Sequence, residues 1–96
     1  MPKGYWIISY RSVADPEALA KYASLAPPVI ASRNGRILAR GVPSRVYESG
    51  DAQRCAIVEF DSLDAAISAY ESAAYQEVAS ILQGAAEREV RILEGA

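Results

Sequence analysis

Apolar positions are densest in one stretch, which predicts a buried strand followed directly by an amphipathic helix. Residues 55–60 read Cys-Ala-Ile-Val-Glu-Phe, a short apolar run typical of a strand covered on both faces. Ser62 is positioned as the N-cap of a helix, and Asp64 lies in the first turn, where a negative charge favours the helix dipole. The helical spacing of apolar side chains continues through Leu63, Ala66, Ile67 and Tyr70.

The N-terminal part of the chain predicts another strand and another helix. Residues 4–11 are predicted to form the first strand, because their side chains are apolar on both alternating faces until Ser9. Asp15, followed by proline and glutamate, predicts a helix start. Pro27 and Pro28 then predict a kink or a restart, and Gly35 predicts the helix end, because glycine accepts the left-handed conformation of a C-cap. The apolar stripe of this helix comprises Ala18, Leu19, Tyr22, Ala23 and Ala26.

The next segment predicts a strand at a sheet edge. Residues 36–41 and 45–48 are interpreted as one long strand, broken at residues 42–44. The break contains Pro43, which cannot donate a hydrogen bond to a neighbouring strand and therefore indicates an edge or a bulge.

The order of the predicted elements indicates a fold class. Helical spacing changes after Tyr70, which predicts a break within residues 72–74, and a loop at 83–86 leads to a final strand at 89–94. The order strand, helix, strand, strand, helix, strand is that of a ferredoxin-like α+β fold. We expect one domain over residues 1–96, whose four-stranded antiparallel sheet has the first and third strands at its centre and both helices on one face.

The two central strands also predict an assembly. Residues 5–8 and 55–58 are apolar on both faces, whereas a sheet with one face in water normally alternates apolar and polar residues. None of the predicted elements is left to cover the second face. We therefore expect a homodimer formed by sheet-to-sheet packing about a two-fold axis.

Composition and charge narrow the classes of partner. The 96 residues are 51% hydrophobic, with a formal net charge of −2 and scattered Lys and Arg, which argues against a nucleic-acid partner. The N-terminus lacks the apolar core of a signal peptide, and no apolar run approaches membrane-spanning length. We expect a cytoplasmic protein with no membrane partner. The lone Cys55 is interpreted as a small buried hydrophobe.

The chain contains no histidine. This excludes Ser-His-Asp and Cys-His catalysis, the usual zinc sites and histidine-ligated haem. The sequence also contains no Walker or GxGxxG motif. We therefore expect no metal and no cofactor.

Glu59 is the most informative polar residue, because it interrupts an otherwise apolar strand and a buried carboxylate must be paired or hydrogen-bonded. One hypothesis makes it a catalytic general base whose pKa is raised by burial, acting on a small aromatic or carbonyl compound. The other makes it a structural residue at the dimer interface, paired with Arg54 or Arg40.

Motifs across almost the whole chain resemble the Domain of Unknown Function 1330 family. They are Lys3-Gly-Tyr-Trp-Ile, Asp15-Pro-Glu, Tyr22, Pro28-Val-Ile, Gly35-Arg, Arg40-Gly, Arg54, Glu59-Phe-x-Ser62, Ala65-Ala66 and Tyr70-x-Ser72-x-x-Tyr75-Gln76. The resemblance implies the dimeric α+β barrel superfamily, in which the ligand cavity generally lies between sheet and helices. The chain departs from the family pattern at Asn34, at Ala73, and at residues 81–84, which lack an arginine common there.

Several side chains are candidates for lining that cavity. Tyr22 and Tyr70 lie on the apolar stripes of the two helices, and Tyr75 follows the predicted break, which suits a pocket mouth. Trp6 and Tyr10 share one face of the first strand. Each aromatic side chain has an alternative role in the core. Arg40 is a candidate anion contact or a solvated edge charge.

The sequence therefore predicts a homodimeric α+β barrel protein with a small-molecule cavity and no assigned biochemical role. One alternative is a cofactor-independent isomerase or monooxygenase that uses Glu59 as its base. Another is a purely structural or protein-interaction dimer.

Overall fold

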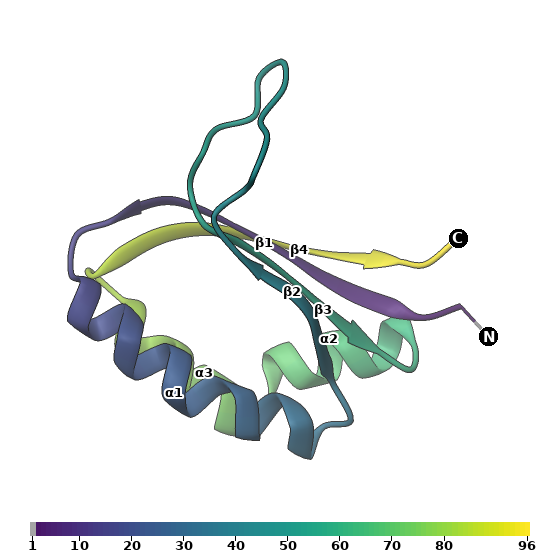
Figure 1. The fold of residues 1–96 in the computed structure, drawn as a ribbon. Helices are drawn as coiled ribbons and strands as arrows, with labels where there is room; N and C mark the ends of the chain where they lie inside the picture. Colours follow the sequence, from purple (N-terminus) through teal and green to yellow (C-terminus); the bar gives the residue numbers. More distant parts are fainter. Residues whose placement is uncertain (1) are drawn as a thin grey trace.

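One antiparallel sheet with strand order β2-β3-β1-β4 forms the framework of the computed structural model, which describes residues 2–96 (Figure 1). Its strands are β1 (Gly4–Val13), β2 (Arg36–Gly41), β3 (Cys55–Phe60) and β4 (Ala86–Glu94). The helical elements are α1 (Pro16–Ser32), α2 (Leu63–Glu71), α3 (Ala73–Ala79) and the short 3-10 helix η1 (Ser80–Leu82). The predicted ferredoxin-like α+β order is confirmed, with β1 and β3 at the centre of the sheet.

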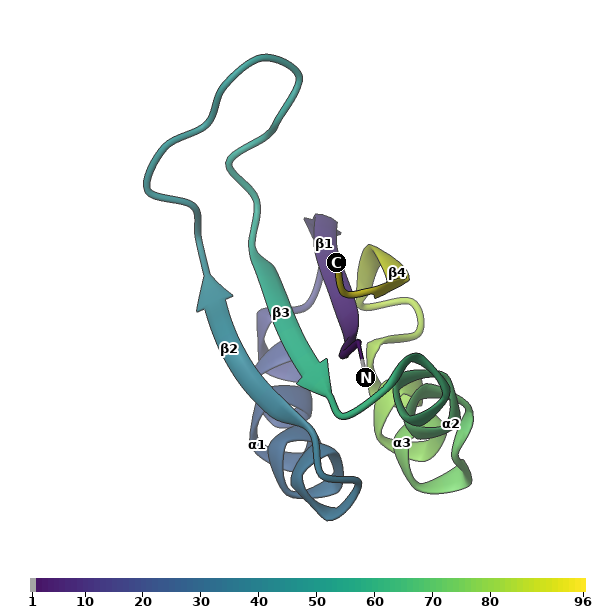
Figure 2. The same cartoon turned by 90° about the vertical axis from the view of Figure 1, so that its right-hand side faces the viewer.

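The three α-helices cover one face of the sheet and leave the other face open (Figure 2). Alternate residues of β1 and β3 point toward the helices, and among them Trp6 and Phe60 are fully buried. The buried side chains of α1 face these strand residues and are spaced four residues apart, at Tyr22, Ala26 and Ile30. No helix among residues 2–96 is long and apolar enough to cross a membrane.

Helix α1 runs through its two prolines as one helix, so the restart predicted as an alternative to a kink does not occur. Pro27 and Pro28 remove the hydrogen bonds that their amides would have donated to the carbonyls one turn earlier. Burial of Tyr22, Ala26 and Ile30 along one stripe holds the helix against the sheet on both sides of this gap. Tertiary packing therefore outweighs the local helix-breaking tendency.

The end of α1 is a Schellman motif, in which the Gly35 amide donates to the Ile30 carbonyl over 2.9 Å. Asn34, with φ of 61°, takes the left-handed conformation that was predicted for glycine. Gly35 is required for space instead, because a Cβ there would lie 2.6 Å from Ile30 Cγ2 and 2.7 Å from the Phe60 ring. The predicted role of this glycine is therefore wrong, although the predicted helix end is right.

Strand β2 lies at the sheet edge as predicted, but it ends at Gly41 and residues 45–48 are not part of any strand. Gly41 has φ of 141°, outside strand geometry, and Pro43 follows without an amide hydrogen to donate. The segment 42–54 instead forms a loop that projects beyond the sheet (Figure 1). The pairing of β2 with β3 also shifts register between Ile37 and Ala39.

The predicted break after α2 is confirmed at Ser72. Its backbone is extended, its hydroxyl donates to the Ala69 carbonyl over 2.7 Å, and the same oxygen accepts from the Tyr75 amide at 3.2 Å. Strand β4 begins at Ala86, three residues before its predicted start, and so includes Arg88. This longer strand determines the composition of the site.

Candidate functional site

A cavity of about 50 Å³ lies between α1 and the helix-facing side of the sheet. Its walls are mainly apolar, and its charged residues are three arginines. The apolar and aromatic lining residues are Ile8, Tyr10, Leu19, Tyr22, Ala23, Ala26, Pro27, Ile30, Ile37, Ala56 and Val58. The volume is well below the roughly 300–1,000 Å³ of typical ligand pockets, so the cavity suits only a very small ligand; its apolar wall and few convergent polar groups are the usual lining of a ligand site.

The three arginines of the lining are Arg40 on β2, Arg54 immediately before β3, and Arg88 on β4. Tyr10 on β1 lies opposite Arg88 on β4 in the strand register, and its amide donates to the Arg54 carbonyl over 2.9 Å. Arg54, Tyr10 and Arg88 therefore form one row across three adjacent chain segments. Arg40 lies opposite Ala56 on the same side of the sheet.

Arg88 connects the sheet to two helices. Its Nη1 donates to the Tyr22 hydroxyl over 3.2 Å, and its Nη2 donates to the Tyr75 hydroxyl over 2.9 Å. The two hydroxyls also form a short hydrogen bond with each other. The guanidinium carbon lies 5.0 Å from the ring centre of Tyr22 and 6.0 Å from that of Tyr10, within cation–π range.

Tyr75 and Tyr10 are held in their neutral form. Burial raises the pKa of the Tyr75 hydroxyl, and the nearby Tyr22 raises this pKa further. Burial also raises the pKa of Tyr10, and the positive charge of Arg88 offsets only part of this effect. Neutral phenols and permanently charged guanidinium groups make a site that donates hydrogen bonds to a ligand rather than one that removes protons.

Arg40, Arg54 and Arg88 form no ion pair with any carboxylate of residues 2–96. By contrast, Arg11 and Arg91 both pair with Glu89, and Arg36 pairs with two carboxylates. The cavity is thus a local concentration of positive charge in a chain whose formal net charge is −2.

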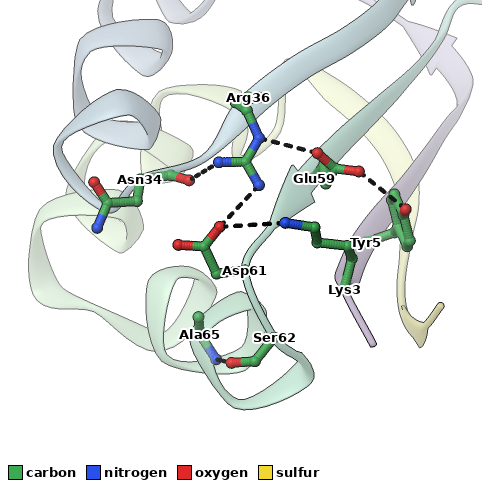
Figure 3. Close-up of polar contacts among 8 residues, drawn as sticks. All are labelled: Lys3, Tyr5, Asn34, Arg36, Glu59, Asp61, Ser62 and Ala65. Atoms are coloured by element: carbon green, nitrogen blue, oxygen red, sulfur yellow. Dashed lines mark hydrogen bonds and ion pairs between the residues drawn. The ribbon is translucent and has the colours of Figure 1, made fainter. Parts of the chain in front are cut away.

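Glu59 lies on the opposite, open face of the sheet (Figure 3). Its carboxylate accepts from Arg36 Nε at 2.9 Å and from the Tyr5 hydroxyl at 3.0 Å. Arg36 also reaches Asp61 at 3.1 Å, and Lys3 lies 3.7 Å from the same carboxylate. Arg36 lies on β2, directly opposite Glu59 on the neighbouring strand. Arg36 is therefore the ion-pair partner of Glu59, instead of the predicted Arg54 or Arg40.

The environment of Glu59 does not suit the predicted general base. Hydrogen bonds, from Arg36 first and Tyr5 second, hold the pKa of its carboxyl below the ordinary value, whereas the catalytic hypothesis requires a raised pKa. The sheet also separates this carboxylate from the cavity lined by Tyr10 and Tyr22.

The remaining predicted ligand contacts form an aromatic cluster behind the cavity. The Trp6 ring centre is 4.7 Å from that of Tyr75 and 5.7 Å from that of Tyr70. Trp6 and Tyr75 are 0% and 1% exposed, and the Trp6 indole donates to the Ala66 carbonyl over 2.8 Å. Tyr75 therefore lies in the core instead of at a pocket mouth. Of the predicted ligand contacts, the cavity brings together Tyr10, Tyr22 and Arg40.

Sequence reasoning missed Arg88 altogether and considered Arg54 only as a partner for Glu59. Arg88 lies just before the strand predicted at residues 89–94 and was therefore not assigned to any face. The available signal was alternation: Arg88, Val90 and Ile92 form one face once the strand begins at Ala86.

The fold and the cavity together define a ferredoxin-like α+β protein with a chamber between sheet and helix. The family described as "Domain of unknown function (DUF1330)" matches residues 3–96, and the chain belongs to this family. No curated protein matches the chain.

Solved structures with the same fold include a protein of unknown function from Rhodopseudomonas palustris, with a TM-score of 0.71 at 16% sequence identity. The match covers 99% of this chain and 83% of that protein's chain. A dimeric ferredoxin-like protein of unknown function from Bacteroides fragilis has a TM-score of 0.59 at 18% identity, covering 96% and 95%. SnoaB, a cofactor-independent oxygenase from Streptomyces nogalater, has a TM-score of 0.62 at 12% identity, covering 100% and 95%.

Proposed function

We propose that the chain is a homodimeric binding protein that holds a small molecule between α1 and the sheet of each subunit. The observation that carries this proposal is the cavity itself, with an apolar wall along α1 and donor groups gathered at one end. This arrangement buries the apolar body of a ligand and orients its polar end.

The open face of the sheet supports the homodimer. On this face Ile7 and Ile57 are cross-strand partners at the centre, and the neighbouring Leu93 is 61% exposed. Apolar side chains on an uncovered sheet face favour association. A second copy is the occupant that fits, because a two-fold axis pairs this face with itself. The Bacteroides fragilis protein of the same fold is described as dimeric.

Binding accounts for the cavity better than acid–base catalysis does. Its lining side chains within residues 2–96 include no carboxylate, thiol or amine, and its hydroxyls are the phenols of Tyr10 and Tyr22. A general base must lie within hydrogen-bond reach of the proton it removes. Glu59 lies on the other side of the sheet. The oxygenase activity of SnoaB is a property of that protein and is not carried to this chain at 12% identity.

Native mass spectrometry of the purified protein tests both parts of the proposal. We expect the mass of a dimer, and saturable binding of at least one small probe from the pairs hexanoate and hexanamide or benzoate and benzamide. A monomer at micromolar concentration would overturn the assembly. No binding of any of the four probes, measured by ligand-observed NMR, would overturn the binding function.

A further inference from the structure

We infer that the molecule held in this cavity is a small monocarboxylate, whose carboxylate is bound by Arg54 and Arg88 with Arg40 beside them and whose apolar body lies against α1. The inference rests on the proposed binding function and adds the chemical class of the ligand. It follows from the positions of the arginines, the missing counter-charges and the shape of the cavity.

The strand register brings the positive charges together. Arg54 and Arg88 flank Tyr10 in one row, and neighbouring strands lie about 4.8 Å apart, so their Cα atoms are roughly 10 Å from each other. The Arg88 guanidinium carbon lies 6.0 Å from the Tyr10 ring centre, and Arg54 lines the same cavity. Positive charges that line one small cavity repel each other unless an anion lies between them.

The chain provides no such anion within residues 2–96. No carboxylate pairs with Arg40, Arg54 or Arg88, and none lines the cavity. Arg54 and Arg88 are not free surface charges, because both are partly buried. Partly buried guanidinium groups without counter-charges indicate a site for an anion that comes from outside the chain.

The remaining geometry favours a carboxylate. Arg88 donates one hydrogen bond to each of two tyrosine hydroxyls, and these bonds fix the plane of its guanidinium group. Its other N–H groups are left to bind a ligand. A guanidinium fork held in one plane matches the two oxygens of a carboxylate. The rest of the lining, from Ile8 to Ile30, is apolar and suits a short aliphatic or aromatic body.

The test compares each acid with its neutral amide of nearly the same shape. Titrations at low ionic strength use hexanoate against hexanamide and benzoate against benzamide, with inorganic phosphate as an anion that has no apolar body. We expect the better acid to bind roughly tenfold or more tightly than its amide. Arg54→Gln should remove this preference, while Arg45→Gln, which changes an exposed arginine of the loop 42–54, should keep it.

The outcomes separate this inference from the proposed function. Equal binding of acid and amide would overturn the carboxylate assignment and leave the binding function standing. Failure of all four organic probes would overturn both. Phosphate binding as tight as that of the better acid would overturn the assignment of an apolar body. Within residues 2–96 the Arg54 side chain forms no ion pair, and its backbone bond to Tyr10 does not depend on the side chain, so circular dichroism of Arg54→Gln should match the unmodified protein.

Discussion

Arg88 on β4 and Tyr22 on α1 make the contact that closes one end of the cavity. The guanidinium carbon lies 5.0 Å from the Tyr22 ring centre, and Nη1 donates to the Tyr22 hydroxyl over 3.2 Å. The same guanidinium reaches Tyr75 on α3. One side chain therefore joins the edge of the sheet to two helices and faces the ligand space, so that stability and binding depend on the same residue.

Replacing Arg88 should destabilise the fold as well as alter the cavity. Arg88→Met keeps the length of the side chain but loses two hydrogen bonds and the cation–π contacts, and we expect about 1–2 kcal/mol less free energy of unfolding. Urea denaturation followed by circular dichroism measures this loss. Arg45→Met is the matched control and should change the free energy by less than about 0.5 kcal/mol. Equal losses in the two variants would contradict a structural role for Arg88.

The Tyr22–Tyr75 hydroxyl pair should be coupled energetically. Removing either hydroxyl, in Tyr22→Phe or Tyr75→Phe, should cost about 1 kcal/mol, and the double variant should cost less than the sum of the two. The double-mutant cycle in urea gives the coupling free energy. Strict additivity would mean that the hydroxyls do not interact in solution.

The open sheet face should be sensitive to charge. Ile57 is 38% exposed at the centre of this face, and Leu25 is 43% exposed on α1, outside the proposed interface. We expect Ile57→Lys to convert the dimer to a monomer, because it buries two unpaired charges about the two-fold axis. Leu25→Lys should remain dimeric. Analytical ultracentrifugation distinguishes the two, and a dimeric Ile57→Lys protein would exclude this face as the interface.

Glu59 should contribute to acid sensitivity. Hydrogen bonds from Arg36 and Tyr5 lower the pKa of its carboxyl in the folded state, so its stabilising effect is present above the ordinary value of 4.5 and is lost as the pH falls through the lowered pKa. Glu59→Gln should therefore flatten the dependence of unfolding free energy on pH between about 5 and 3. Glu77→Gln, an exposed glutamate without an ion pair in residues 2–96, should keep the slope of the unmodified protein.

The close approach at Gly35 should tolerate no added carbon. Gly35→Ala places a Cβ 2.6 Å from Ile30 Cγ2, and overpacking of this kind costs about 1–3 kcal/mol. Asn34→Gly relieves a left-handed residue and should leave the free energy of unfolding within about 0.5 kcal/mol. If thermal unfolding shows Gly35→Ala to be as stable as the unmodified protein, the packing of Ile30 on Phe60 is looser than described.

Local patterns were sufficient to predict the fold. Strand runs such as residues 55–60, and the Ser62 and Asp15 caps, indicate their elements through short-range chemistry that the tertiary structure keeps. The errors arose where long-range packing decides the outcome. Pro27 suggests a restart when only its neighbours are considered, but contacts of α1 with the sheet hold the helix together.

The site was harder to predict than the fold. Tyr10 and Tyr22 were anticipated from strand and helix alternation and Arg40 as a candidate anion contact, and all three line the cavity. The face that carries Glu59 depends on strand register, which the sequence left undetermined by one residue. Arg88 was missed because its position beside Tyr10 is a cross-strand relationship between residues at opposite ends of the chain.

The pairing of β1 with β4 joins the beginning of the chain to its end, from Gly4 opposite Glu94 to Val13 opposite Ala86. During synthesis on the ribosome, β1 emerges before β4, and one of its hydrogen-bonding edges stays vacant until β4 has been translated. An unpaired edge of this kind invites association with other strands. The nascent chain therefore depends on β4 both to protect the central strand β1 and to supply Arg88, so the cavity is completed only when the sheet itself is complete.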